Sequence, residues 1–372
     1  MTGRERVTPL YVTKPIPPDR AVFDDLVQRM VEQGIYTNFG PLERDLTERL
    51  SHRFGVRRMM LTNNGTSALL AALLALGKIG GTVITTPFTF AATVHSITLA
   101  GFRVKFADVD RDTLNLSPES VRSVMTDDVV AILPVHVYGN PCDVPAFDAI
   151  GREFGVTLIY DAAHCFDVYE NGRSIYLEGD LSVGSLHATK LMHTGEGGLL
   201  CASNGVYLDR VRQAINFGIE GEEIVSGVGF NGKMSEVNAA MGLSVLPMVG
   251  TEIARRKIVH DLYVAMLARL PGVIRPTFRA SVTRNYMYFP VLVTEQAGFS
   301  RDAWWTALRQ KGIFARKYFY PLISNCSPYD QIGSIDLPAA AWGAERALCL
   351  PIHRDVTEDD VKEIVQTAAA LV

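Results

Sequence analysis

The chain has 372 residues, of which 48% are hydrophobic and 20% are charged. Because a domain usually comprises roughly 100–200 residues, this length and composition predict two folded domains and exclude a disordered chain. The net charge is −4, so no basic excess favours nucleic acid or an acidic membrane as a partner.

The cysteines and the apolar stretches indicate the compartment. The five cysteines are odd in number, widely spaced and never paired as C-x-x-C, which argues against disulfides and zinc and favours a reducing compartment. The first 18 residues lack the apolar core of a signal peptide, and the longest apolar stretches, such as residues 68–76, are shorter than the roughly 20 residues of a membrane span. We therefore expect a soluble cytoplasmic protein.

Two amphipathic helices are predicted first, one along residues 23–31 and one along residues 42–50, where apolar residues recur at helical spacing. Short apolar, β-branched runs then alternate with segments of helical period. Because these strands show little polar alternation, we expect an α/β fold with a mostly parallel sheet covered by helices on both faces. The predicted strands are residues 59–62, 82–86, 129–135 and 156–160, and the predicted helices are residues 66–76, 91–100 and part of 144–154.

The last third of the sequence has a different pattern. Residues 250–270 are predicted to form one long helix, followed by a strand at 286–293 and a helix at 302–311. Thr357 and Asp360 resemble a capping box that opens a final helix. We place the domain boundary near Gly250, so that residues 1–249 form the N-terminal helices and the large domain, and residues 250–372 form the linking helix and a small α+β domain.

Several common enzyme signatures are absent from the sequence. There is no G-x-G-x-x-G, H-E-x-x-H or G-x-S-x-G, and the eight histidines show no metal-ligand spacing. Residues 227–233 match the first seven positions of a phosphate loop, but Met234 replaces the Ser or Thr that would hold magnesium. These observations argue against dehydrogenases, ATPases, zinc hydrolases and serine hydrolases.

Three other features have chemical meaning. Residues 63–67 (NNGTS) form a polar turn between a strand and a helix, where helix N–H groups suit a phosphate. Asp161 ends a buried strand, where open α/β sheets bind ligands. Lys190 stands among small and apolar residues, and a desolvated lysine can form a Schiff base. Each has a plain alternative: a capping turn, a structural acid or an exposed lysine.

Together, these three features fit an enzyme that uses pyridoxal 5′-phosphate. The turn would hold the cofactor phosphate, the acid would keep the pyridine nitrogen protonated, and the lysine would carry the aldehyde and move the α-proton.

The sequence resembles the sugar aminotransferases of the DegT/DnrJ/EryC1/StrS family, which adopt the aspartate-aminotransferase (type I) fold. The resemblance rests on nine motifs spread over almost the whole chain. They are TNFGP (37–41), NGTSA (64–68), TPFTF (86–90), HVYG (136–139), DAAH (161–164), HATK (187–190), GEGG (195–198), GFNGKMSE (229–236) and LPI (350–352).

The resemblance implies a role for particular residues. Lys190 would carry the cofactor, and Asp161 would face the pyridine nitrogen. The remaining cofactor contacts would be His164 near the 3-hydroxyl, Phe90 on the ring, Gly65, Thr66 and Ser185 at the phosphate, and Asn231 reaching the phosphate of the other subunit of a homodimer. Many members have an aromatic residue and Arg after that asparagine, whereas this chain has Gly232-Lys233. Phe90 could instead be a packing residue at a helix start.

The resemblance also implies the reaction. Members that dehydrate carry His in place of the lysine, so Lys190 favours amino transfer, with L-glutamate as the donor. The segments VTKPIPP (12–18), NYMYFP (285–290) and ARKYFYP (315–321) resemble members that act on dTDP-4-keto-6-deoxyglucose, which is therefore the expected acceptor. Transfer to C3 of a 3-keto sugar is the alternative, and a non-catalytic protein that binds the cofactor or a nucleotide sugar is a second one. Candidate substrate-binding residues are Arg316, Lys317, Tyr318 and Tyr320, which could equally form a surface strand with its tyrosines packed inward.

Overall fold

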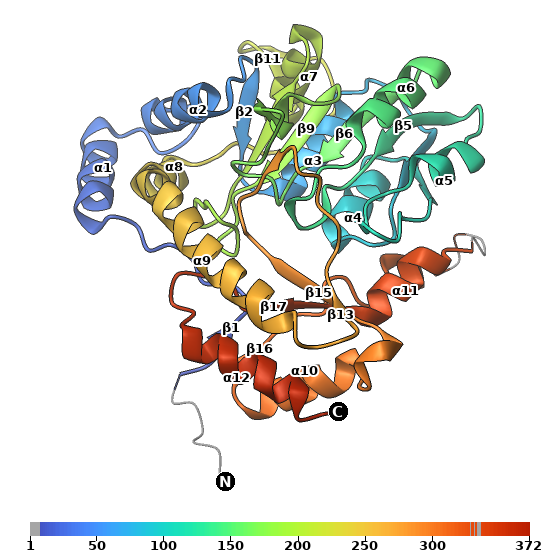
Figure 1. Ribbon diagram of the computed structural model, residues 1–372. Coiled ribbons are helices and arrows are strands. Elements are labelled where there is room, and N and C mark those ends of the chain that lie inside the picture. Colours follow the sequence, from blue (N-terminus) through green and yellow to red (C-terminus); the bar gives the residue numbers. More distant parts are fainter. Residues whose placement is uncertain (1–7, 328, 331, 333–335) are drawn as a thin grey trace.

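A seven-stranded sheet lies at the centre of the larger part of the protein, seen at the upper right of the computed structural model (Figure 1). The structure describes residues 8–327, 329, 330, 332 and 336–372. The strand order is β2 (Met59–Thr62), β10 (Gly198–Ala202), β9 (Leu181–Ser185), β6 (Thr157–Asp161), β5 (Val129–Leu133), β3 (Thr82–Thr85) and β4 (Arg103–Phe106). Only β10 runs antiparallel to its neighbours in this sheet, which confirms the predicted mostly parallel arrangement.

Helices cover this sheet. They are α3 (Gly65–Leu74), α4 (Ala91–Leu99), α5 (Pro118–Ser123), α6 (Val144–Phe154) and α7 (Gly205–Ile215). Every residue of β2, β3 and β10 is buried, which explains why these strands are continuous apolar runs in the sequence. Helix α3 packs against β9, β10, α4 and α7, so its start is held firmly at one edge of the sheet.

The two N-terminal helices lie beside the sheet, not on it. Helices α1 (Arg20–Gln33) and α2 (Pro41–Phe54) pack against α8 (Glu236–Val245), as the blue helices at the left of Figure 1 show. The predicted apolar stripe of α2 is confirmed, because Leu42, Leu46 and Leu50 are all buried. Both helices end at a glycine in the left-handed conformation, Gly34 and Gly55.

A smaller layer follows the long helix α9 (Val249–Leu267). Its sheet has the antiparallel order β13 (Val273–Ile274), β15 (Phe289–Val293) and β17 (Ala347–Leu350), and its helices are α10 (Arg301–Gln310), α11 (Pro338–Arg346) and α12 (Glu358–Ala369). The predicted capping box at Thr357 and Asp360 is confirmed by hydrogen bonds in both directions. Trp304 is fully buried in the core of this layer.

The short strands include two local hairpins and pairs between distant segments. The further strands are β1 (Leu10–Tyr11), β7 (Tyr169–Glu170), β8 (Arg173–Ser174), β11 (Ile219–Glu220), β12 (Ile224–Val225), β14 (Val282–Thr283) and β16 (Ile313–Phe314), and the single-turn helices are η1 (Val137–Gly139), η2 (Ile175–Leu177), η3 (Leu246–Met248), η4 (Glu295–Ala297) and η5 (Ile323–Asn325). The hairpins are β7–β8 and β11–β12, whereas β1 pairs in parallel with β16, so residues near the N-terminus lie with the C-terminal layer. The domain boundary at Gly250 stays a prediction.

One predicted strand begins later than expected. The sequence predicts a strand over residues 286–293, whereas β15 starts at Phe289. Tyr286 has φ of 52°, a left-handed conformation that interrupts an extended chain.

One stretch of the described chain, Glu236–Leu267, is long and apolar enough to cross a membrane by length and composition alone. It comprises α8, η3 and α9, and half of its most apolar window is buried inside the protein. Because α8 packs on α1 and α2, and α9 packs on α12, the apolar character of this stretch is explained by core packing.

Candidate active site

A cavity of about 340 Å³ lies at the carboxyl ends of β6 and β9, where a parallel sheet presents its ligand-binding edge. We call it the central cavity. Of the predicted site residues, it is lined by Gly65, Thr66, Phe90, Asp161, His164, Ser185, Lys190 and Tyr318. The structure therefore brings together eight residues that the sequence spreads over more than 250 positions.

The turn before α3 forms one wall of the central cavity. The Asn64 side chain caps the helix by accepting a hydrogen bond from the Ser67 N–H at 2.8 Å. Gly65 is the first residue of α3, and a Cβ added there would lie 3.1 Å from Ser185 Cβ. Glycine thus allows the Ser185 hydroxyl to lie next to the helix start, where N–H groups without helical partners and the helix dipole favour an anion.

Asp161 is the last residue of β6 and is buried. Its Oδ2 accepts a hydrogen bond from Thr93 Oγ1 at 2.8 Å, and its Oδ1 accepts one from the Ala163 N–H at 3.1 Å. Burial raises the pKa of this carboxyl, while the hydrogen bond from Thr93 and the charge of Lys190 act in the opposite direction. A buried carboxylate is stable when it faces a positive group, and a protonated pyridine nitrogen in the central cavity would be such a group.

Lys190 lies in the loop between β9 and β10 and is half-buried against the central cavity. Burial lowers the pKa of its amine from 10.5 to about 8, although the nearby Asp161 carboxylate acts against this shift. Roughly one in ten of these amines is therefore neutral and nucleophilic at pH 7, compared with fewer than about one in a thousand for an ordinary lysine.

The glycine motif after Lys190 holds its loop in place. The Leu186 N–H donates to the Gly197 carbonyl and the Ala188 N–H donates to the Gly195 carbonyl, so the loop folds back on itself. A Cβ added at Gly198 would lie 2.5 Å from the Asn64 carbonyl oxygen. The motif thus allows the lysine loop to pack directly on the turn before α3.

His164 forms a second polar wall. It is buried, and its Nδ1 accepts a hydrogen bond from the Tyr138 N–H at 3.2 Å, which places the proton of the neutral ring on Nε2. Burial lowers the pKa of His164 well below its usual value, so the ring is neutral. Phe319 lies parallel to the imidazole, and Tyr288 meets it edge-on at 4.9 Å between ring centres.

The sequence analysis missed several residues of this site. Thr93, Tyr288 and Phe319 line the central cavity, and Tyr138 fixes the proton on His164. Tyr138, Tyr288 and Phe319 lie in segments that carry the family resemblance, but the sequence assigned none of them a role, and Thr93 lies in none of these segments.

Phe90 precedes α4, and its ring remains 64% exposed while it lines the central cavity. Such exposure of a large apolar ring does not fit the alternative of a packing residue, and it leaves a flat face available to a bound ring.

The other predicted residues lie outside the central cavity as the described part of the chain forms it. Lys317 pairs with Asp302 at 2.7 Å and lies over the Trp305 ring. Arg316 and Tyr320 are exposed, and Arg316 forms an isolated antiparallel β-bridge with Cys349. Asn231 is exposed, and its carbonyl accepts a hydrogen bond from Asn63 Nδ2 at 3.1 Å. Their roles stay predictions.

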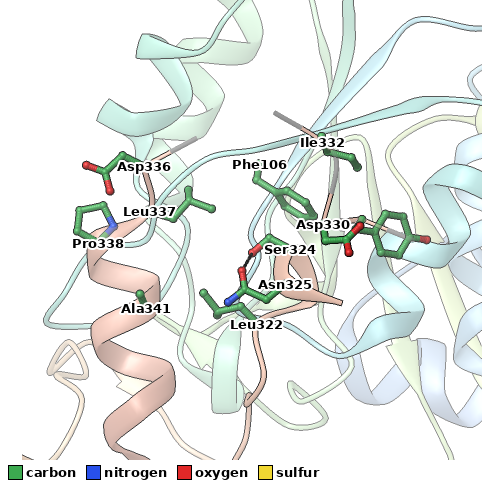
Figure 2. Close-up of a pocket in the computed structure, with 11 residues that line it drawn as sticks. Phe106, Leu322, Ser324, Asn325, Asp330, Ile332, Asp336, Leu337, Pro338 and Ala341 are labelled. Carbon is green, nitrogen blue, oxygen red and sulfur yellow. Dashed lines mark hydrogen bonds between the residues drawn. The ribbon is translucent and has the colours of Figure 1, made fainter. Parts of the chain in front are cut away.

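A second cavity of about 280 Å³ contains none of the predicted residues (Figure 2). It lies between Phe106 at the end of β4 and the start of α11, and the side chains of Ser324 and Asn325 meet within it. Among the residues that the structure describes, no three His, Cys, Asp or Glu side chains are grouped to hold a metal ion.

Known proteins are similar to this chain in sequence and in fold. Residues 19–369 match the DegT/DnrJ/EryC1/StrS aminotransferase family. The dTDP-4-amino-4,6-dideoxy-D-glucose transaminase of Shigella dysenteriae is 38% identical over 360 residues, covering 96% of this chain and 98% of that enzyme. The transaminase of the same name from Escherichia coli is 38% identical over 359 residues, covering 95% of this chain and 96% of that enzyme.

A solved structure has a similar fold over nearly the whole chain. DesI, determined in the presence of its TDP-sugar product, has a TM-score of 0.93 at 34% identity, covering 98% of this chain and 93% of DesI. The aminotransferase fold expected from the sequence is therefore confirmed. The chain belongs to the DegT/DnrJ/EryC1/StrS aminotransferase family, whose members act with pyridoxal 5′-phosphate.

Proposed function

We propose that the protein transfers an amino group from L-glutamate to C4 of dTDP-4-keto-6-deoxyglucose, giving the 4-amino sugar. The observation that carries this proposal is the convergence of Lys190, Asp161 and the turn at Gly65 on one cavity. The choice of sugar is supported by the two curated relatives, which are named for the corresponding dTDP-linked 4-amino sugar.

The residues present suit the cofactor. When bound, pyridoxal 5′-phosphate supplies an aldehyde that accepts amines and a ring that delocalises negative charge from the neighbouring carbon. Gly65, Thr66 and Ser185 would hold its phosphate at the start of α3, where the helix dipole favours an anion. Phe90 would cover one face of the ring, and the Nε2–H of His164 would donate to its hydroxyl oxygen.

Lys190 and Asp161 would divide the proton chemistry. With a pKa of about 8, Lys190 can be neutral and accept a proton at Nζ, which it can then return to the neighbouring carbon. In the first half of the reaction it would take this proton from the donor, and in the second half it would deliver a proton to the sugar. The Asp161 carboxylate, held by Thr93 and the Ala163 N–H, would keep a proton on the ring nitrogen that faces it. Its fixed position matters most when charge develops on the ring.

The rim of the central cavity would select the substrate. Tyr288, Tyr318 and Phe319 lie on the side contributed by the C-terminal layer, and they offer apolar faces and hydroxyl groups to a sugar and a base. Arg316 lies two residues before Tyr318 and is exposed, and its positive charge would attract the diphosphate of the substrate.

We further propose a homodimer in which Asn231 reaches the partner's cofactor phosphate. Its support is the exposure of Asn231 beside the β11–β12 hairpin, where Ile224 and Val225 also expose apolar side chains. The five free cysteines support a reducing compartment such as the cytoplasm.

A panel of nucleotide-linked keto sugars with L-glutamate tests the proposal. We expect dTDP-4-keto-6-deoxyglucose to give an amine with the mass of the 4-amino sugar, and nuclear magnetic resonance to place nitrogen on C4. An amine on C3 of a 3-keto sugar would support the alternative instead. If glutamate does not change the absorbance of the bound cofactor, the protein is not a glutamate-dependent aminotransferase.

A further inference from the structure

Two arginines outside the central cavity share a single acceptor. Arg275 Nη1 lies 3.3 Å from Nε2 of His260, and Arg284 Nη1 lies 3.2 Å from the same nitrogen. Nδ1 of His260 lies 3.0 Å from the Asp261 carboxylate, so Nδ1 carries the proton and Nε2 has one lone pair for two cationic donors. We call Arg275, Arg284 and His260 the two-arginine cluster.

This cluster lacks a matching negative charge. In the described residues, neither Arg275 nor Arg284 forms an ion pair with a carboxylate, and Asp261 is engaged by Lys257 at 2.6 Å. Because Asp261 is already paired with Lys257, Arg275 and Arg284 carry two positive charges that have no ion-pair partner among the described residues. Burial lowers the pKa of Arg284 to about 10, and the charge of Arg275 acts in the same direction.

Aromatic rings hold Arg284 in place without neutralising it. Its guanidinium carbon lies 3.7 Å from the centre of the Phe278 ring and 5.4 Å from that of Tyr286. Cation–π contacts fix the direction of the guanidinium but leave its hydrogen-bond donors available to an acceptor. The cluster is thus a preformed arrangement of donors without an anion.

We propose that the two-arginine cluster binds a phosphate group. A phosphate dianion matches the two positive charges of these arginines, and its separate oxygens can accept from both guanidiniums at once. The small open pocket beside His260, Pro276 and Pro290 has a volume of about 10 Å³, which suits one oxygen while the rest of the group remains at the surface. Both free phosphate and a phosphorylated metabolite have this chemistry.

The site is distinct from the central cavity but is connected to it by one segment. Asn285 follows Arg284, and its Nδ2 donates to the carbonyls of His164 and Phe166 at 2.8 Å. Tyr288, three residues further, lines the central cavity. The proposal does not depend on which sugar the enzyme uses, so it can fail while the proposed function stands.

Calorimetric titration of the cofactor-loaded enzyme with inorganic phosphate at constant ionic strength tests the proposal. We expect one phosphate per chain, and we expect Arg284→Gln and Arg275→Gln each to weaken it about tenfold or more, since each removes a charge-assisted hydrogen bond. Arg255→Gln is the matched control, because Arg255 is exposed on the same helix as His260, and this variant should bind phosphate normally.

Further measurements distinguish free phosphate from a phosphorylated metabolite and provide a second readout of phosphate binding. Competition by glucose 1-phosphate would identify a phosphorylated metabolite as a ligand, whereas binding of inorganic phosphate alone would identify the free ion. Phosphate should also raise the melting temperature of the wild type and of Arg255→Gln, but not that of Arg284→Gln. Absence of phosphate binding, equal binding by chloride, or unchanged binding in both cluster variants would overturn the proposal.

Discussion

The chemistry assigned to Lys190 depends on how far burial favours its neutral form. The lysine pKa of about 8 lies below the ordinary value of 10.5, so between these two values the native protein binds fewer protons than the unfolded chain. Stability from this group is therefore lowest below pH 8 and increases as the pH rises towards 10.5. The same shift makes the amine reactive at a pH where exposed lysines are protonated.

The first prediction concerns this reactivity. In the cofactor-free enzyme, reductive methylation of Lys190 should show a midpoint near pH 8. Lys257, whose pKa is raised by its hydrogen bond to Asp261, should react with a midpoint above 10.5. Peptide mass spectrometry across a pH series measures both lysines in one sample, and equal midpoints would contradict the assigned role of burial.

Replacement of Lys190 gives the second prediction. Lys190→Ala should leave a folded protein whose amino transfer is about 10²–10⁴-fold slower or more, because the proton-transferring amine is lost. Lys257→Ala is the control and should retain full activity, since this exposed lysine lies outside the central cavity. Borohydride reduction of the wild type should attach the cofactor to Lys190, and a label on another lysine would refute the assignment.

Asp161 gives the third prediction. Asp161→Asn should lower turnover by about 10²-fold or more while retaining most of the bound cofactor, because the charge acts chiefly as the ring accepts electrons. Thr93→Val should have a smaller effect, about fivefold to tenfold, because it removes only one hydrogen bond to the carboxylate. The absorbance of bound cofactor and kcat are measured together. Near wild-type turnover in Asp161→Asn would mean that this acid is only structural.

At the scale of secondary-structure elements, two sequence motifs prove to be halves of one helix cap. The Glu236 carboxylate, from the motif at residues 229–236, accepts hydrogen bonds from the Leu42 and Glu43 N–H groups at 2.8 Å each. Helix α2 thus has a buried charged cap supplied by α8, in place of a side chain of its own. A Cβ added at Gly40 would lie 2.5 Å from Glu236 Cδ, so glycine is required for this approach.

The fourth prediction follows from this cap. Glu236→Ala should lower the free energy of unfolding by about 2–3 kcal/mol, whereas Glu48→Ala, an exposed control on α2, should change it by less than about 0.5 kcal/mol. Gly40→Ala should disturb the same contact, so the double variant should cost less than the sum of the single changes. Denaturant titration of the wild type and the four variants measures these free energies of unfolding. If the losses from Glu236→Ala and Gly40→Ala simply add in the double variant, the two positions act independently.

Elements whose signals are local could be predicted from the sequence. The stripe of α2, the buried strands and the capping box of α12 each depend on neighbouring residues, and the structure has them. The stripe of α1 is confirmed only in part, because Leu26 and Met30 are buried whereas Val31 is exposed. The strands β1 and β14 could not be predicted, because each pairs only with a segment far away in the sequence. For the same reason, the sequence could not place Thr93 beside Asp161 or Tyr138 beside His164.

At the scale of the whole molecule, the segment around Asn231 decides how two chains would share their sites. Its backbone is fixed to its own chain, because Asn63 donates to the Asn231 carbonyl and the Asn63 N–H donates to the Gly232 carbonyl at 2.8 Å. Lys233 is buried, donates to Asn216 Oδ1 at 2.9 Å and lies over the Phe217 ring. The Asn231 side chain is therefore presented from a rigid base.

The fifth prediction is complementation between inactive subunits. Mixing Lys190→Ala with Asn231→Asp under conditions of subunit exchange should restore activity towards half the wild-type value in each mixed dimer, because one site then has both defects and the other has neither. Each variant mixed with itself is the control. If Asn231→Asp is inactive and exchange restores nothing, Asn231 serves the site of its own chain, and the shared-site proposal fails.

The parallel pairing of β1 with β16 also has a consequence for how the protein is made. Leu10 emerges from the ribosome long before its partner Ile313, so the first strand must wait, unpaired, while most of the chain is synthesised. The β1–β16 pairing forms only after residues about 300 positions apart have met, which is a non-local contact of the slow kind. Deletion of the chain through Tyr11 should therefore expose the edge of β16 and make newly made chains prone to aggregate, although neither strand lines the central cavity.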